Sequence, residues 1–164
     1  MFENKITHES RIAVIGVGSS LHSDDAVGLM VAETLKDFTL RERVENIKVF
    51  IGETAPENLT GEIKRFKPTH IILIDAADFK GKPGESRILN ASETNGVSFS
   101  THIMPLKIIL DYLEKSTGAT SRIIGIQPLA VNFGSELSLE VKSAIPKTVD
   151  IILSELNLFQ RSTN

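Results

Sequence analysis

The chain has 164 residues, the size of one domain, and its 41% hydrophobic and 24% charged residues are ordinary for a globular protein. A net charge of −3, without a basic stripe, argues against nucleic acid as a partner. The absence of cysteine excludes disulfides, thiolate metal sites and a cysteine nucleophile, so any metal must be held by His, Asp or Glu.

The N-terminal segment, residues 1–10, is polar and lacks a basic region followed by an apolar core. We therefore expect a loose leader rather than a secretory signal. No stretch reaches the roughly 18 to 20 apolar residues that a membrane helix needs. These features predict a cytoplasmic protein with one domain over residues 1–164 and no membrane contact.

The first half of the chain predicts alternating strands and helices. Residues 11–17 (RIAVIGV) are apolar, β-branched and rich in glycine at one end, which predicts a buried strand. The next helix is expected to begin near Ser23, and a second strand is expected at residues 48–51. Thr54 and Glu57 match a capping box, so a second helix is predicted with Thr54 as its N-cap.

The middle of the chain continues the alternation. Residues 70–74 (HIILI) are the strongest strand candidate, and this strand is predicted to end on Asp75. A short strand is expected at residues 86–89. Pro105 suits the first turn of a further helix, because amides in a first turn have no helical partner.

The last part of the chain predicts a strand at residues 122–127 and a helix that begins near Ser138. Pro146 is expected to kink or divide this helix. Alternation of strands and helices throughout predicts an α/β fold with three layers (α/β/α), in which helices cover both faces of a mostly parallel central sheet.

Possible metal ligands stand where such a fold places its active site. Asp25 follows the first strand, and Asp75 follows the third. Ligands of parallel sheets bind beyond the carboxyl ends of the strands, so we expect these carboxylates to meet at one edge. With His102, which precedes a helix, they would form a nitrogen and oxygen ligand set that suits Ni²⁺ or Zn²⁺ and leaves a position open for water or substrate. Hydrolysis is the natural chemistry of such a site.

The sequence pattern alone also allows a simpler interpretation of each residue. Asp24 and Asp25 could complement the positive end of the following helix, with Ser23 as its N-cap. His102 could be a surface residue near a helix start. His22, beside the acidic pair, competes with His102 as a metal ligand.

The glycine-rich turn also half-matches a dinucleotide-binding fingerprint. Gly16 and Gly18 stand at the first two glycine positions, but Leu21 replaces the third, where its side chain would obstruct close packing of helix on strand. The acidic residue expected after the second strand is represented only by Glu53. A nucleotide-binding domain is therefore an alternative supported by a weak pattern.

Several segments together resemble a known family. They are GVGSSLHSDDAVG (16–28), APENL (55–59), IDAADFKGKPGE (74–85), STHIMPL (100–106) and GIQP (125–128). In this order and spacing they resemble the hydrogenase maturation proteases, which trim the C-terminal extension from the large-subunit precursor of [NiFe] hydrogenases. The resemblance covers roughly residues 11–158, which we predict to be the protease domain, and leaves residues 1–10 outside it.

The resemblance implies a role for each matched position. Asp25, Asp75 and His102 fall on the family's metal-binding positions and are the predicted catalytic residues. The resemblance implies that the metal is nickel supplied by the [NiFe] hydrogenase large-subunit precursor, and that the enzyme cleaves this precursor after nickel insertion. Aspartate at position 25, where many members have glutamate, resembles the hydrogenase-3-type branch. Asp24 and Asp78 are hypothesised to support the ligands.

Two further expectations accompany this function. We expect a monomer that meets its precursor transiently. A non-catalytic nickel-binding module, which inspects the precursor without cleaving it, is the alternative within hydrogenase assembly.

Overall fold

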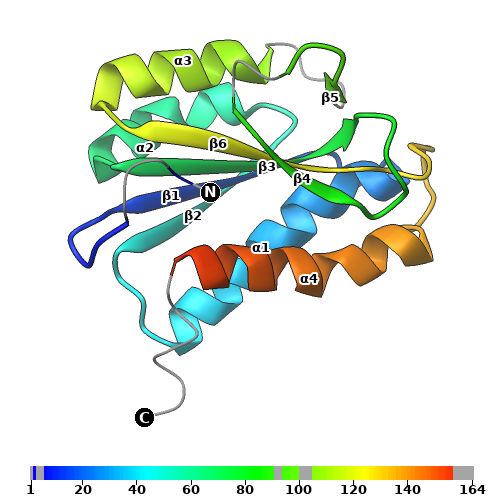
Figure 1. Cartoon of the computed structure of the whole chain (residues 1–164), viewed down its shortest axis with the longest axis horizontal. Coiled ribbons are helices and arrows are strands. Elements are labelled where there is room, and N and C mark those ends of the chain that lie inside the picture. Colours follow the sequence, from blue (N-terminus) through cyan, green and yellow to red (C-terminus); the bar gives the residue numbers. More distant parts are fainter. Residues whose placement is uncertain (1, 3–5, 91–93, 100–104, 157–164) are drawn as a thin grey trace.

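The computed structural model describes residues 2, 6–90, 94–99 and 105–156. A central sheet has the strand order β2-β1-β3-β6-β4, and the short strand β5 pairs with β3 off this path (Figure 1). The strands are β1 (Ile12–Val17), β2 (Ile47–Glu53), β3 (His70–Asp78), β4 (Ser86–Leu89), β5 (Ser98–Phe99) and β6 (Thr120–Ile126). Neighbours among β2, β1, β3 and β6 pair in parallel, whereas β4 and β5 run antiparallel to their partners.

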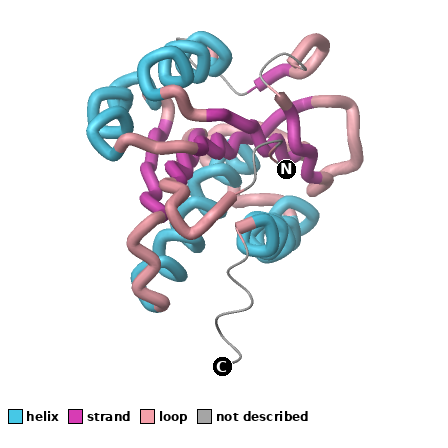
Figure 2. Tube along the Cα trace, turned by 60° about the vertical axis from the view of Figure 1, so that its left-hand side comes forward, coloured by secondary structure: helices cyan, strands magenta, loops and turns pink. Residues whose placement is uncertain are grey.

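Helices lie on both faces of the sheet, as Figure 1 and Figure 2 show. One face is covered by α1 (Val27–Arg41) and α4 (Leu139–Glu155). The other is covered by α2 (Thr60–Phe66) and α3 (Leu106–Thr117). Short 3₁₀ turns, η1 (Ser23–Ala26) and η2 (Pro56–Leu59), precede α1 and α2. The predicted three-layer α/β/α architecture with a mostly parallel sheet is confirmed.

The central strand β3 contributes to both hydrophobic cores. Ile72 and Ile74 pack into the core beneath α1 and α4, while Ile71 and Leu73 pack into the core beneath α2 and α3. All of these side chains are completely buried. A strand buried on both faces needs apolar residues at every position, which explains the unbroken run HIILI.

Small residues let α1 lie unusually close to the sheet. A Cβ atom on Gly28 would lie 2.3 Å from the carbonyl oxygen of Val17 and 2.4 Å from that of Ile74. A Cβ atom on Gly16 would lie 2.4 Å from the Cβ of Ala32. The first turn of α1 therefore rests directly on the ends of β1 and β3, and this contact positions the candidate site.

β3 is longer than predicted. Asp75 does not end the strand but pairs with Gly125 of β6, and β3 continues to Asp78, where it pairs with β5. The short strand β5 was not predicted. Partners on both sides of β3 extend it past the apolar run from which its end was inferred.

The predicted capping box at Thr54 and Glu57 is wrong. The turn η2 begins at Pro56 with Ala55 as its N-cap, and no side-chain cap bond is formed within the described chain. A Cβ atom on Gly52 would lie only 3.0 Å from the Cβ of Pro56. Packing of the buried proline against the end of β2 thus sets the start of the turn, and α2 begins only at Thr60.

The last helix begins as predicted but is not divided. Ser138 is the N-cap of α4, and its Oγ accepts a hydrogen bond from the amide of Val141 at 3.4 Å. Pro146 lies inside one helix that runs from Leu139 to Glu155. Division at Pro146 was wrong, because a long buried face holds both halves of α4 against the core despite the missing amide donor.

The N-terminal segment includes residues that contact the core. Phe2 lies with its ring 4.8 Å from that of His70 in an edge-on arrangement, and Phe2 and Ile6 are partly buried against the α1 and α4 side. None of the described helices is long and apolar enough to span a membrane.

The packing of α1 gives a first prediction. Gly28→Ala should lower the free energy of unfolding by about 1 to 3 kcal/mol, because the added methyl group meets backbone oxygens that cannot move aside easily. Urea denaturation followed by circular dichroism measures the change. Gly61→Ala in α2 is the matched control, since its Cβ would meet only an Arg65 nitrogen at 3.8 Å, and we expect no loss of stability. Equal stability of the two variants would contradict the close contact.

Candidate active site at the carboxyl edge of the sheet

The turn that follows β1 folds back so that its later residues lie against Gly18, near the start of the turn. Gly18 has φ +141°, and a Cβ there would lie 1.9 Å from the carbonyl oxygen of Asp25. Its amide donates to the carbonyl oxygen of Glu53 at the end of β2. The helix expected near Ser23 begins there as the 3₁₀ turn η1, with α1 following from Val27. Residues 19–25, the site turn, are thereby held at the carboxyl edge of the sheet.

Asp25 lies in this turn as a buried carboxylate that is only half satisfied. It is 2% exposed, and its Oδ2 accepts a hydrogen bond from the amide of Ser19 at 2.8 Å. Its Oδ1 has no hydrogen-bond partner among the described residues. Buried carboxylate oxygens are costly unless a donor or cation serves them. The arrangement therefore leaves one oxygen available for a ligand.

Asp75 lies on the neighbouring strand and is completely buried. It follows Ile74, which pairs with Gly16 of β1, and it pairs with Gly125 of β6. The turn η1, which carries Asp25, contacts β3. The elements that carry Asp25 and Asp75 therefore meet at this edge of the sheet, as expected from the sequence.

His102, the third predicted ligand, lies outside the described residues. Before it, Phe99 of β5 pairs with Ala77, two positions beyond Asp75 on β3. The described part of the chain, to which His102 does not belong, holds no group of three or more possible metal ligands. Assignment of Asp25, Asp75 and His102 as metal ligands stays a prediction.

Asp24 has a different role from its neighbour, because donors on a distant segment use both of its oxygens. Oδ2 accepts from the amides of Leu129 at 2.8 Å and Ala130 at 3.1 Å and from the hydroxyl of Ser138 at 2.9 Å, and Oδ1 accepts from the amide of Ser138 at 2.7 Å. Asp24 therefore fixes the segment between β6 and α4, residues 127–138, which we call the linking loop. This role of Asp24 could not be predicted from the sequence, since more than 100 positions separate the partners.

His22 contacts the linking loop from the same turn. Its Nδ1 lies 2.9 Å from Ser19 Oγ, and its ring lies 5.4 Å from that of Phe133 in an edge-on contact. His22 and Phe133 also form an isolated antiparallel bridge. These contacts join His22 to the loop and to Ser19, whose amide binds Asp25.

The structure disfavours the nucleotide-binding alternative. Leu21 is 60% exposed and does not obstruct the helix; Gly28 provides the close approach to the sheet instead. Asp24 and Asp25 place buried carboxylates before α1, where a dinucleotide site would bind phosphate at the helix N-terminus. Like charges at that position repel the ligand.

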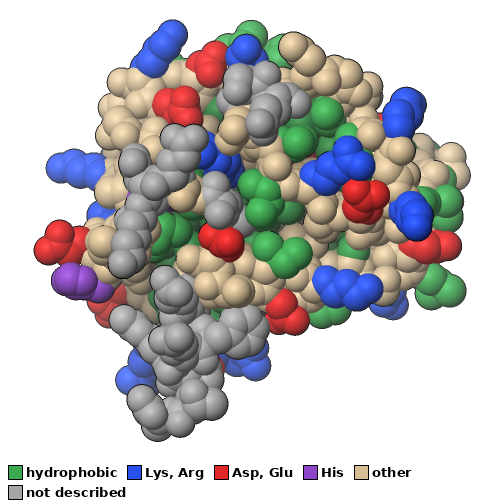
Figure 3. All heavy atoms as spheres, viewed as in Figure 1, with side chains coloured by type: hydrophobic (Ala, Val, Ile, Leu, Met, Phe, Trp, Pro, Cys, Tyr) green, Lys and Arg blue, Asp and Glu red, His purple; other side chains and the backbone are tan. Residues whose placement is uncertain are grey.

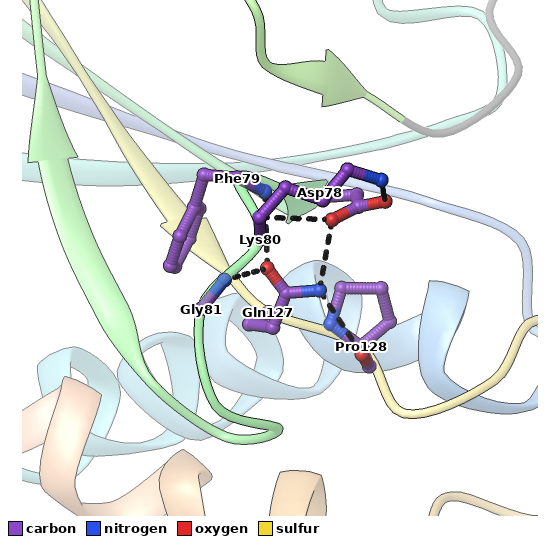
Figure 4. A network of polar contacts seen from close by, with 6 residues as sticks. All are labelled: Asp78, Phe79, Lys80, Gly81, Gln127 and Pro128. Carbon is purple, nitrogen blue, oxygen red and sulfur yellow. Dashed lines mark hydrogen bonds and ion pairs between the residues drawn. The ribbon is translucent and has the colours of Figure 1, made fainter.

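Gln127 holds the ends of β3 and β6 together (Figure 4). Its Oε1 accepts from the amides of Phe79 and Gly81, both at 3.0 Å. Its Nε2 donates to Asp78 Oδ1 at 3.1 Å and to the carbonyl oxygen of Pro128 at 3.3 Å. Asp78 thus acts through Gln127 on the start of the linking loop. The hypothesis that Asp24 and Asp78 support the metal ligands stays a prediction.

Glu57 carries a second carboxylate oxygen that is buried without a partner in the described chain. This oxygen, Oε2, belongs to η2, which contacts β2. Glu57 does not complete a metal-ligand group with Asp25 and Asp75, because all three are described and no such group is found among the described residues. The structure gives it no further role.

Comparison with known proteins identifies the family. A family model described as hydrogenase maturation protease matches residues 29–155. The hydrogenase 3 maturation protease of Escherichia coli is 32% identical over 79% of this chain and 80% of its own. A Methanocaldococcus jannaschii protein whose name also assigns it to these proteases is 36% identical over 96% of this chain and 97% of its own.

Solved structures agree with this result. The crystal structure of a [NiFe] hydrogenase maturation protease from Thermococcus kodakarensis matches with a TM-score of 0.81 and 31% identity, over 92% of this chain and 95% of that one. The chain belongs to the hydrogenase maturation protease family and is a peptidase.

Asp24 generates the second prediction. Asp24→Ala should lower the free energy of unfolding by about 3 kcal/mol, because it leaves the partly buried donors of Leu129, Ala130 and Ser138 without their acceptor. Urea denaturation provides the measurement. The control is Asp37→Ala, which removes an exposed carboxylate of α1 and should change stability by no more than about 0.5 kcal/mol. A loss as small as that of the control would mean that the loop is held by other contacts.

The third prediction concerns the protonation of Asp78. Hydrogen bonds from the Lys80 side chain and amide, and then from Gln127, lower the pKa of Asp78 from 3.8 to about 2. Because the folded pKa lies below the unfolded one, the stabilising contribution is complete above about pH 4 and is lost as the pH falls toward 2. Carboxyl ¹³C NMR titration should show this pKa and its rise in Lys80→Ala.

Lys82→Ala is the control for this titration, since the charge of Lys82 acts on Glu85 and is not among the causes that lower the pKa of Asp78. It should leave the pKa of Asp78 unchanged. Equal titration curves for the Lys80 and Lys82 variants would remove Lys80 as the cause.

Proposed function

We propose that this protease removes the C-terminal extension of a [NiFe] hydrogenase large-subunit precursor after nickel insertion, and that it recognises the nickel held by that precursor. The observation that carries the proposal is the buried Oδ1 of Asp25, which lacks a partner among the described residues at the edge where β3 presents Asp75. Family membership indicates the reaction, which is peptide-bond hydrolysis, and the buried carboxylates explain why a cation binds there.

The donor set fits a cation brought by the substrate. A carboxylate that is buried and half satisfied is stabilised when a positive charge arrives beside it. The amide of Ser19 occupies Oδ2 of Asp25, so Oδ1 is the oxygen left for this charge. Two aspartates with the imidazole of His102 provide oxygen and nitrogen ligands, which nickel accepts.

The chain's own groups then position and activate the scissile bond. Nickel, when bound, supplies positive charge that polarises a peptide carbonyl or lowers the pKa of a water molecule. Asp25 and Asp75 hold the nickel-bearing segment of the precursor at the sheet edge. Whichever carboxylate oxygen is not engaged by the cation can accept the proton of the attacking water as a general base.

Intact-mass analysis of the precursor tests this function. A hydrogenase large-subunit precursor from the same organism is incubated with the protein, once nickel-loaded and once nickel-free. Loss of a C-terminal peptide from the loaded precursor alone is the expected result. Cleavage of both forms would overturn the nickel check. Stable binding without a mass change, while a control protease cleaves the same precursor, would favour the non-catalytic nickel-binding module.

The fourth prediction concerns the three proposed ligands. Asp25→Asn, Asp75→Asn and His102→Ala should each lower the cleavage rate at least 100-fold, because each removes a group that binds the cation or moves a proton. Single-turnover mass spectrometry measures the rate. Asp37→Asn, on the exposed side of α1, is the matched control and should cleave normally. Circular dichroism confirms that the variants fold, and full activity in folded variants would disprove the site.

A further inference from the structure

Apolar side chains project from the linking loop into solvent. Phe133 is 74% exposed, Leu129 55% and Val131 47%, and Leu21 of the site turn is 60% exposed. We call these residues the apolar rim. Figure 3 shows apolar side chains on the right-hand side of the molecule, where the loop between β6 and α4 lies in Figure 1. Residues 128–135 include no charged side chain. Four apolar side chains exposed on one loop and the turn beside it exceed the single exposed residues that any surface carries, and such groups mark sites of interaction.

The rim is held in place rather than loosely attached. Ala130 and Asn132, which alternate with the rim residues, bind the site turn: Ser23 Oγ donates to the Ala130 carbonyl oxygen at 2.7 Å and accepts from the Asn132 amide at 2.9 Å. The amide of Gly134 donates to the carbonyl oxygen of Leu21 at 2.8 Å. The backbone is thus fixed to the turn while the apolar side chains stay exposed, so binding need not order the loop first.

The rim is continuous with the candidate active site. Asp25 binds the amide of Ser19, the hydroxyl of Ser19 contacts His22, and the ring of His22 contacts Phe133. A polypeptide that reaches Asp25 therefore meets a surface that continues directly into the rim.

A hollow adjoins the rim on the α1 and α4 side. It has a volume of about 410 Å³, and its walls include Ser20, beside Leu21, and Ser135, close to Phe133. Its lining is mixed, with Met30, Leu137 and Ile145 as apolar residues and Glu136 and Lys142 as charged ones. Such a hollow can receive a single apolar side chain from a bound polypeptide.

We propose that the apolar rim docks an apolar segment of the hydrogenase precursor beside the bond presented to Asp25 and Asp75. This inference rests on the proposed function and names the surface through which the enzyme selects its protein substrate. A second copy of this chain fits less well as the occupant, because a lasting dimer through the rim would cover the site that the substrate must enter. Lack of charge along residues 128–135 means that selection there is by apolar contact.

The fifth prediction tests the rim through the kinetics of Phe133→Ser. Cleavage of the nickel-loaded precursor should lose at least 10-fold in kcat/KM, with the loss in KM and with kcat within twofold of the wild type. A contact that is equally strong in the ground state and the transition state affects KM alone. Phe133→Leu should restore most of the loss, since leucine keeps apolar area. A kcat/KM of Phe133→Ser within twofold of the wild type would overturn the proposal.

Leu40→Ser is the matched control. Leu40 is 69% exposed, close to Phe133 in exposure, but it lies at the far end of α1 from the site turn. It should cleave like the wild type, and equal losses in the Leu40 and Phe133 variants would overturn docking at the rim. Thermal unfolding of each variant shows whether any loss reflects folding.

A binding experiment separates this proposal from the proposed function. Biolayer interferometry measures the affinity of the nickel-loaded precursor for the Asp25→Asn variant and for the double variant that also carries Phe133→Ser. A Kd at least 10-fold weaker in the double variant supports the rim even if the wild type cleaves nothing, in which case only the peptidase proposal fails. If the wild type cleaves the precursor and the double variant binds it as tightly as Asp25→Asn does, docking at the rim is overturned while the peptidase proposal stands. Light scattering measures the oligomeric state. A wild-type dimer that Phe133→Ser converts to a monomer with normal cleavage would assign the rim to self-association and overturn docking.

Discussion

The buried carboxylate of Asp24 holds the carboxyl edge of the sheet in one arrangement. It receives hydrogen bonds from Leu129, Ala130 and Ser138, so the turn after β1 and the linking loop, up to the N-cap of α4, meet at one side chain. A buried charge is costly unless donors compensate it. These segments therefore take up their positions together, and both the acidic site and the apolar rim depend on that assembly.

Asp24 and Asp25 show how adjacent residues of one type can serve different ends. Their exposed fractions are nearly equal, at 1% and 2%. Asp24 has donors on both oxygens, whereas Asp25 keeps Oδ1 without a partner within the described chain. A buried carboxylate that has hydrogen-bond donors on both oxygens stabilises the fold, whereas a buried carboxylate with one oxygen unpaired is expected at a binding site. Burial alone could not have distinguished the two.

The sequence was sufficient for the order of strands and helices along the chain apart from β5, because the central strands are apolar runs that alternate with helical patterns. It also predicted that Asp25 and Asp75 come to one edge, since parallel strands end on the same side, and the turn η1 that carries Asp25 does contact β3. Local pattern failed at Thr54, where packing of Pro56 on the sheet set the start of the turn. It could not find the contact of Asp24 with Ser138, because nothing near either residue indicates a partner so distant along the chain.

The distance between Asp24 and Ser138 along the chain has a consequence for synthesis. Chains emerge from the ribosome N-terminus first and fold as they appear. The segments that carry Asp25 and Asp75 emerge early, whereas the donors that fix the site turn arrive only with the linking loop and α4. A growing chain thus lacks the donors that hold the site turn until the linking loop and the N-cap of α4 have left the ribosome. A fragment that ends before Ser138 therefore carries both carboxylates without the contacts that fix the turn between them.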